Sequence, residues 1–252
     1  MRTFLGLESP VAIAHRGGAA EHPENTMAAF EHAVELGYPC IETDVRSTRD
    51  GVAMVFHDEN LDRLTDHIGP LVERDWAQLD DVRIAGKEPI VRLEDLLGAW
   101  PDLRLIIDPK SDDVVTPLID VLRRTNARDR VCIGSFSARR LRRIRDELPG
   151  CTSCSPAEVV RLRADSWGVP TGKLAADCAQ VPPRHPLFAG LSIPVVDAAF
   201  LRSAHARGMP VQVWTVNDDA EMAHLLDLGA DGIMSDRVTA LKDLFERRGL
   251  WR

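Results

Sequence analysis

Short apolar runs alternate with stretches of helical periodicity along the whole chain, and this alternation restricts the fold more than any other feature of the sequence. It is typical of parallel sheets whose strands are joined by crossover helices, so it predicts an α/β fold. The runs with the composition of strands are Val11–His15, Ile41–Val45, Met54–His57, Leu103–Asp108, Val131–Phe136, Thr152–Ser155, Ala179–Pro182, Val211–Asn217 and Gly232–Ser235.

Several stretches between these runs have apolar residues at helical spacing. In the first of them, Met27, Phe30 and Val34 share one face, and Gly37 suits the cap at the C-terminal end. The predicted helices cover about 25–36, 137–148, 197–207, 218–228 and 237–247.

The second and third apolar runs lie too close together for a helical crossover, which needs about a dozen residues. The dipeptide Asp50-Gly51 between them is typical of a hairpin turn. We therefore expect Met54–His57 to fold back on Ile41–Val45, which leaves eight runs for a closed parallel barrel. A chain of 252 residues suits one (β/α)₈ (TIM) barrel. We expect a single domain over 1–252, with a small insertion at about 59–100 over the barrel mouth.

The formal net charge of −8 argues against binding to nucleic acid. An enzyme for an anionic phosphate would then need its positive charge locally, in the site. Residues 1–10 lack the features of a secretory signal, and no apolar run approaches the roughly 20 residues that span a bilayer. These observations predict a cytoplasmic protein without stable membrane association, and they leave its oligomeric state open.

The cysteines are odd in number, which argues against a disulfide framework. Cys151-x-x-Cys154 has the spacing of redox and zinc motifs, but no second pair or nearby histidine completes a zinc set. We interpret all five as structural thiols: Cys40, Cys132, Cys151, Cys154 and Cys178.

Glu42 and Asp44 are two residues apart in a predicted strand, so their side chains point the same way. Their neighbours Ile41 and Val45 indicate a buried run. Two like charges on one buried face are costly unless a positive group lies between them. Oxygen ligands favour a hard cation such as Mg²⁺ or Ca²⁺, and pairing with an arginine is the alternative.

Histidines end two of the apolar runs, and in parallel barrels the carboxyl ends of the strands carry the active site. After His15, Arg16 can bind a phosphate through two parallel hydrogen bonds. Gly17 and Gly18 would let backbone N–H groups approach an anion. Together with His57, His15 would supply an acid and a base, the minimal set for phosphodiester cleavage near neutral pH.

Two further strand ends add charged side chains to this rim. Asp58 follows His57 and either orients its ring or caps a turn. Asp108 and Lys110 follow the fourth run and offer a third carboxylate and a second cation, with a surface ion pair as the alternative.

Several motifs resemble, in order and spacing, those of the glycerophosphodiester phosphodiesterase family of phospholipase C-like barrels. The segments 213–217 and 229–233 are similar to the C-terminal pattern of that family, whereas 150–194 matches weakly. The motifs that carry the resemblance are His15-Arg16-Gly17-Gly18, Pro23-Glu24-Asn25-Thr26, Glu42-Thr43-Asp44-Val45, His57-Asp58 and Asp108-Pro109-Lys110.

The resemblance implies metal-dependent hydrolysis of small glycerophosphodiesters to glycerol 3-phosphate and an alcohol. It leaves open which histidine is the base, and whether water or the glycerol 2-hydroxyl attacks the phosphorus. Glu24 would orient the loop of His15 and Arg16, and Asn25 and Thr26 would begin a helix. The implied roles are metal binding by Glu42, Asp44 and Asp108, with Mg²⁺ or Ca²⁺ as the cofactor, acid–base catalysis by His15 and His57, and substrate binding by Arg16, Lys110 and Trp214.

Asp108 stands where the family usually has glutamate, which is similar to sphingomyelinase D-type phospholipases. An alternative is therefore a lysophospholipase D or sphingomyelinase D-like activity on lipids. Leu187, Phe188 and Leu191, within 167–193, would then supply an apolar membrane-facing surface. A third reading is a barrel that has lost catalysis and binds phosphate ligands. We expect soluble deacylated phosphodiesters to be preferred over lipids.

Overall fold

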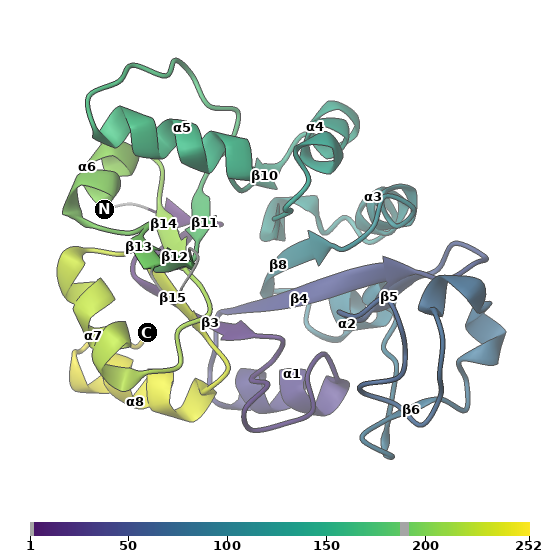
Figure 1. The fold of residues 1–252 in the computed structure, drawn as a ribbon. Helices are drawn as coiled ribbons and strands as arrows, with labels where there is room; N and C mark the ends of the chain where they lie inside the picture. The colour runs from purple at the N-terminus through teal and green to yellow at the C-terminus, as the bar shows by residue number, and fades with distance from the viewer. Residues whose placement is uncertain (1–2, 187–191) are drawn as a thin grey trace.

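The computed structural model describes residues 3–186 and 192–252, and within them eight parallel strands curve into a barrel (Figure 1). The strands pair in the order β10–β9–β8–β4–β3–β15–β14–β11, and a bridge between Ser153 and Cys178 joins the two ends of this row. The ring is therefore closed, which confirms the predicted fold class. Its strands are β3 (Val11–His15), β4 (Cys40–Ser47), β8 (Arg104–Pro109), β9 (Val131–Ile133), β10 (Cys151–Thr152), β11 (Ala179–Val181), β14 (Val211–Val213) and β15 (Gly232–Ser235).

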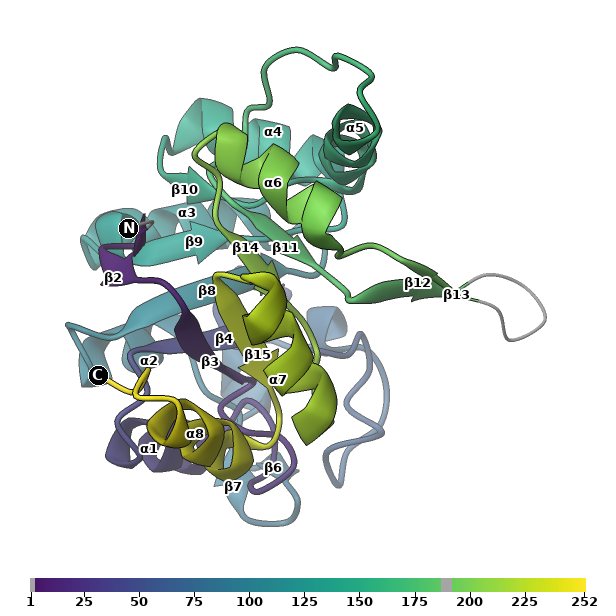
Figure 2. The ribbon, with the colours of Figure 1, turned by 90° about the vertical axis from the view of Figure 1, so that its left-hand side faces the viewer.

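The helices lie outside the strands, as two views at right angles show (Figures 1 and 2). All of the predicted helices form, close to their predicted ends. The sequence analysis missed α3 and α5, although Ser155 and Glu158 form a capping box at the start of α5. The helices are α1 (Met27–Glu35), α2 (Leu93–Ala99), α3 (Val115–Arg124), α4 (Ala138–Glu147), α5 (Pro156–Ser166), α6 (Ala198–Ala206), α7 (Asp219–Leu228) and α8 (Val238–Arg247).

The strand β5 (Ala53–Val55) pairs antiparallel with β4, which confirms the predicted hairpin. Gly51 has a φ of 80°, a conformation that favours glycine, and its N–H donates to the carbonyl of Thr48. Because the chain reverses here, the segment that follows β5 returns along the carboxyl-end half of β4 and brings His57 back to the barrel rim.

The insertion after β5 builds a small core of its own at the carboxyl end of β4 (Figure 1). Phe56, Leu61 and Leu71 are among its fully buried side chains. No residue of 59–100 lines the cavity described below, so the insertion flanks the barrel mouth and does not cover it. Its elements are two 3₁₀ turns (Leu71–Glu73 and Trp76–Gln78), the hairpin of β6 (Arg83–Ile84) and β7 (Glu88–Pro89), and α2.

The two sides of the barrel differ in the extent of strand pairing. β4 pairs with β8 over six residues, whereas β10 pairs with β9 over two. The interior below the mouth is apolar, and an N-terminal hairpin of β1 (Thr3–Phe4) and β2 (Leu7–Glu8) packs against it through Phe4, Leu5 and Leu7. The seam between β10 and β11 is thus the least paired part of the ring.

A second hairpin, of β12 (Arg184–Pro186) and β13 (Ser192–Pro194), projects away from the barrel (Figure 2). Leu187, Phe188 and Leu191, which we expected in an apolar surface, lie outside the described residues. In the described part of the chain, no helix combines the length and hydrophobicity needed to cross a membrane.

Candidate active site

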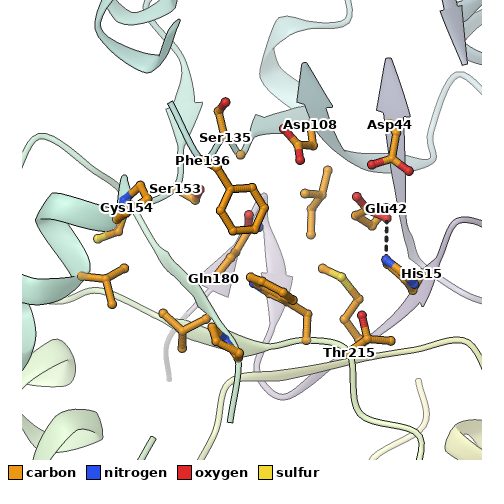
Figure 3. Close-up of a pocket in the computed structure, with 18 of the residues that line it drawn as sticks. His15, Glu42, Asp44, Asp108, Ser135, Phe136, Ser153, Cys154, Gln180 and Thr215 are labelled. Carbon is orange, nitrogen blue, oxygen red and sulfur yellow. Dashed lines mark ion pairs between the residues drawn. The ribbon is translucent and has the colours of Figure 1, made fainter. Parts of the chain in front are cut away.

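A cavity of about 490 Å³ opens at the carboxyl ends of the barrel strands (Figure 3). All eight barrel strands, or the segments that follow them, contribute to its walls, together with the segment after β5 and the start of α5. The structure brings every predicted site residue to this cavity, although they lie up to about 200 positions apart in sequence. They are His15, Arg16, Glu42, Asp44, His57, Asp108, Lys110 and Trp214.

His15 ends β3, and both of its ring nitrogens face carboxylates. Its Nδ1 lies 2.6 Å from Asp236 Oδ1, and its Nε2 lies 3.6 Å from Glu42 Oε2. Burial lowers the pKa of His15, but the charges of Glu42 and Asp236 outweigh it and raise the pKa above the ordinary value. Asp236 therefore fixes the ring and leaves Nε2 toward the cavity.

Asp236 is a site residue that the sequence analysis missed. It directly follows β15, so the strand-end criterion that selected His15 and His57 would have selected it as well. Asn217 holds the other carboxylate oxygen, because its Nδ2 donates to Asp236 Oδ2 at 2.7 Å. Its pairing with His15 spans 221 positions and could be recognised only once β15 was known to lie beside β3.

His57 has the same arrangement from a different source. Its Nδ1 lies 2.6 Å from Asp58 Oδ1, so Asp58 orients the ring. Arg63, from the insertion, donates through Nε to Asp58 Oδ2 at 2.5 Å and lowers the pKa of Asp58 well below its usual range. Arg63 also binds Glu24, which accepts from Arg16 Nη1 at 2.8 Å. The insertion thus supports the rim from outside the cavity.

Asp44 is the best compensated of the carboxylates, with 1% of its side chain exposed. Lys110 Nζ lies 2.7 Å from Oδ1, Arg16 Nε lies 3.0 Å from Oδ2, and Asn25 Nδ2 donates to Oδ2 at 3.0 Å. Burial raises the pKa of Asp44, but Lys110 and Arg16 outweigh it and lower the pKa below the ordinary value. Asp44 is therefore ionised.

We predicted that both Asn25 and Thr26 would begin a helix, but only Thr26 does so. Thr26 is the N-cap of α1, where its Oγ1 accepts from the backbone N–H of Ala29 at 3.2 Å. Asn25 instead orients Asp44, and its own Oδ1 accepts from Thr43 at 2.8 Å. Its φ of 59° is left-handed, a conformation that asparagine adopts more readily than most residues.

Glu42 is buried and Asp108 is partly buried, with 13% of its side chain exposed, and neither carboxylate is fully compensated. Burial and the charge of Asp44 raise the pKa of Glu42 to about 7, and its nearest basic side chain is His15 at 3.6 Å. Burial also raises the pKa of Asp108, although Lys110 Nζ lies 2.8 Å from its Oδ2. Asp108 Oδ1 is buried and has no hydrogen-bond partner. The site therefore holds more buried negative charge than its own cations neutralise.

This deficit is the property that a bound hard cation would correct, so the oxygen donors of Glu42, Asp44 and Asp108 fit Mg²⁺ or Ca²⁺. We expected these three carboxylates to bind one metal together, but their oxygen atoms do not lie close enough to one another to share an ion in this arrangement. Among the described residues, the only His, Cys, Asp or Glu side chains that meet in a group of three within 4.8 Å are cysteines. Lys110 already pairs with two of them, because its ammonium lies 2.7 Å from Asp44 Oδ1 and 2.8 Å from Asp108 Oδ2.

Gly17 and Gly18 are required for packing at this rim. A Cβ on Gly17 would lie 2.8 Å from Ala29 Cβ in α1, and one on Gly18 would lie 2.8 Å from Val238 in α8. Both residues also have positive φ values, of 81° and 106°. The two glycines thus let the loop of Arg16 sit directly on the helices below it.

Opposite the carboxylates, the cavity wall is largely apolar, and Ser135, Ser153 and Gln180 are its polar members (Figure 3). Phe136 is 66% exposed, and its ring meets Trp214 edge to face with centroids 5.6 Å apart. Val159 and Val160 of α5 and Val195 continue this wall. The cavity therefore has a charged half that can bind a phosphate and a metal, and an apolar half that can contact uncharged parts of a substrate.

The family model described as "Glycerophosphoryl diester phosphodiesterase family" matches residues 15–240. This span contains both histidines, the three carboxylates and Asp236. The chain belongs to the glycerophosphoryl diester phosphodiesterase family. The resemblance stated from the sequence is thereby confirmed, and with it the class of enzyme, a phosphoric diester hydrolase.

Individual relatives agree with the family match. A Mycobacterium tuberculosis protein named probable glycerophosphodiester phosphodiesterase 2 is 38% identical over 98% of this chain and 95% of its own length. A human protein named lysophospholipase D is 27% identical over 92% of this chain and 84% of its own length. The structure of an Oleispira antarctica phosphodiesterase in complex with the product sn-glycerol-3-phosphate aligns with a TM-score of 0.77 at 22% identity, over 94% of this chain and 97% of that one.

Proposed function

We propose that this family member hydrolyses soluble glycerophosphodiesters to glycerol 3-phosphate and an alcohol, using a divalent cation, Mg²⁺ or Ca²⁺. The observation that carries the proposal is the pair of histidines, each held at Nδ1 by a carboxylate and each lining the same carboxylate-rich cavity. The relatives named glycerophosphodiester phosphodiesterase support the substrate class.

Three side chains would hold the metal: Glu42, Asp44 and Asp108. When bound, a divalent cation at this position would neutralise their excess charge and withdraw electron density from a phosphate oxygen. The chain supplies two cations of its own for the phosphate, Arg16 and Lys110, although both pair with carboxylates as the structure stands. This arrangement supplies the local positive charge that a protein of net charge −8 needs for an anionic substrate.

The histidines would move the protons of the reaction. One Nε2 removes a proton from the attacking hydroxyl, whose oxygen forms a new bond to phosphorus. The bond between phosphorus and the leaving alcohol breaks, and the other Nε2 gives that oxygen a proton. With water as the nucleophile, one water is consumed and the two products form at once. With the glycerol 2-hydroxyl, a cyclic phosphate forms first and water then opens it.

Asp236 and Asp58 would act as positioning residues. Each accepts from an Nδ1 and so keeps the proton-transferring Nε2 of its partner, His15 or His57, directed toward the cavity. Asp58 is adjacent to His57 in sequence, whereas Asp236 is 221 positions from His15 and reaches it because β15 pairs with β3.

A panel of soluble and lipid phosphodiesters, assayed with Mg²⁺, Ca²⁺ and a chelator, tests the proposal. We expect glycerophosphocholine or glycerophosphoethanolamine to be cleaved with release of glycerol 3-phosphate, and chelator to stop the reaction. Release of no product from any member of the panel would contradict the proposal and would favour a barrel that binds phosphates without catalysis.

A second candidate function, lysophospholipase D activity, has one observation in its favour. The apolar half of the cavity is exposed at Phe136 and Val160, which are 66% and 68% accessible, and it could receive an acyl chain. The human relative named lysophospholipase D is consistent with this candidate. The ratio of kcat/KM for glycerophosphocholine to that for lysophosphatidylcholine, below its micellar concentration, distinguishes the two. A tenfold preference for the lipid would establish the second candidate.

A further inference from the structure

Three cysteines meet inside the barrel, away from the carboxylates of the active site. Cys132 lies in β9, Cys151 begins β10, and Cys178 directly precedes β11. Their sulfur atoms all lie within 4.8 Å of one another, and those of Cys132 and Cys178 are 3.7 Å apart. Cys154, which completes the C-x-x-C spacing in the sequence, contacts Met209 instead. The sequence motif is therefore not the cluster that the fold assembles.

The barrel geometry explains why these thiols converge. Cys151 is the register partner of Cys132 on the neighbouring strand. Each cysteine stands two residues before a residue that lines the active-site cavity, and side chains two apart on a strand point the same way. Those cavity residues are Gly134, Ser153 and Gln180. The cysteines thus form the inward-facing layer directly beneath the floor of the cavity.

We propose that Cys132, Cys151 and Cys178 form a binding site for a soft, thiolate-seeking metal ion of the Zn²⁺ or Cu⁺ class. Zinc–sulfur bonds are about 2.3 Å long, so two sulfurs bound tetrahedrally to one ion stand about 3.8 Å apart. The 3.7 Å between Cys132 and Cys178 already matches that spacing. The site differs in donor chemistry from the carboxylates above it, which suit hard cations.

The exposure of the three thiols shows how an ion could reach the cluster. Binding would release the thiol protons, because the thiolate is the form that ligates a metal. Cys151 is only partly buried, whereas Cys132 and Cys178 are fully buried, so the ion would enter past Cys151.

An ion here would link the least paired part of the barrel. Within the described residues, β10 and β11 share a single bridge, Ser153 to Cys178, and β10 itself is two residues long. A metal bound to Cys132, Cys151 and Cys178 would connect β9, β10 and the start of β11 across that seam. The expected consequence is greater stability of the closed ring, since a ligand that binds only the folded state stabilises it.

The test is titration of the purified full chain, under reducing conditions, with Zn²⁺, Cu⁺ and Cd²⁺, the last as a spectroscopic stand-in for Zn²⁺. We expect one equivalent of Cd²⁺ to give sulfur-to-metal charge-transfer absorption and to raise the unfolding midpoint by several degrees. Both signals should persist in Glu42→Gln, which alters only the carboxylate site. In Cys151→Ser and Cys132→Ser, the affinity for Cd²⁺ that both signals report should fall at least tenfold.

The matched control is Cys154→Ser, which removes a thiol of the same segment that lies outside the cluster. It should keep both the absorption and the increase in unfolding midpoint. If Cys151→Ser fails to fold, Cys178→Ser and the thiol count of the wild type with and without metal give the same information. Absence of charge-transfer absorption in the reduced wild type, or equal loss in Cys154→Ser, would overturn the proposal. Protection of about three thiols from alkylation by Cd²⁺ would support it.

Discussion

The charged and apolar halves of the barrel mouth are built on different kinds of strand. The charged half stands on β3, β4 and β8, where β4 and β8 pair over six residues and hold Glu42, Asp44 and Asp108 in register. The apolar half stands on short strands and the loops after them, which carry Phe136 and Trp214. The three carboxylates are thus held by the most extensively paired strands, whereas the apolar side chains stand on segments with little strand pairing.

The largest expected effect is in the charged half, at Glu42. Glu42→Gln should reduce turnover to background, because it removes an anionic ligand from a buried site that would bind the metal only through such charges. High metal concentration should restore little. Calorimetric titration of Mg²⁺ and Ca²⁺ into both proteins measures the cause. Glu35→Gln is the control, since Glu35 is exposed at the end of α1 and lies outside the cavity. Equal metal affinity in Glu42→Gln and wild type would defeat the assignment.

The next effect is that of the acid–base pair. His15→Ala and His57→Ala should each lower kcat by about 10²–10⁴-fold while the fold stays intact, the usual range for a general acid or base. The double variant should lose less than the product of the two, because both residues act on one transition state. Steady-state kinetics on a substrate with a poor leaving group decides the matter. A variant with near wild-type kcat would show that its histidine is structural.

Asp236 should have a smaller effect, since it acts through His15. Asp236→Asn should lower kcat by about 10–100-fold, with a smaller change in KM, because the ring loses its anionic partner but keeps its place. Asp236→Glu should recover part of the loss. The split between kcat and KM is the measurement, with circular dichroism as the check on folding. A change confined to KM would indicate that Asp236 contacts the substrate instead.

The smallest effect on the soluble substrate should come from the apolar half. Phe136→Ala should change kcat/KM for glycerophosphocholine by less than about threefold. It should lower any activity on lysophosphatidylcholine by about tenfold, since an aromatic contact that a bound acyl chain buries is worth a few kcal/mol at most. Val169→Ala is the matched control, because Val169 is exposed but lies outside the cavity. A large loss on the soluble substrate would show that Phe136 contacts the glycerol unit and that the halves are not separate.

Most of the charged half could be predicted from the sequence, whereas in the apolar half only Trp214 was predicted, through the family resemblance. His15 and His57 end apolar runs of the sequence, and Glu42 alternates with Asp44 within one strand, so residue type and spacing report both position and direction. Asp236 and Arg63 were missed because their roles depend on contacts 221 and 39 positions away. The position of Lys110 between two carboxylates depends on side-chain packing, which spacing does not encode.

The cysteines show the same limit. The C-x-x-C spacing drew attention to Cys151 and Cys154, but the cluster joins Cys151 to Cys132 and Cys178. Cys151 begins β10 and Cys178 directly precedes β11, and these two parts of the chain meet only where the barrel closes. The sequence analysis interpreted all five cysteines as structural thiols and did not predict the cluster, because neighbouring strands, not neighbouring residues, bring the three sulfurs together.

The most direct test of the account is turnover of glycerophosphocholine by the metal-depleted protein. After chelation and removal of the chelator, wild type should release no glycerol 3-phosphate, and added Mg²⁺ or Ca²⁺ should restore release in proportion to occupancy of a single site. Glu42→Gln should stay inactive throughout. Undiminished release by the protein without divalent cation, verified by elemental analysis, would contradict the proposal that Glu42, Asp44 and Asp108 serve the reaction through a bound metal.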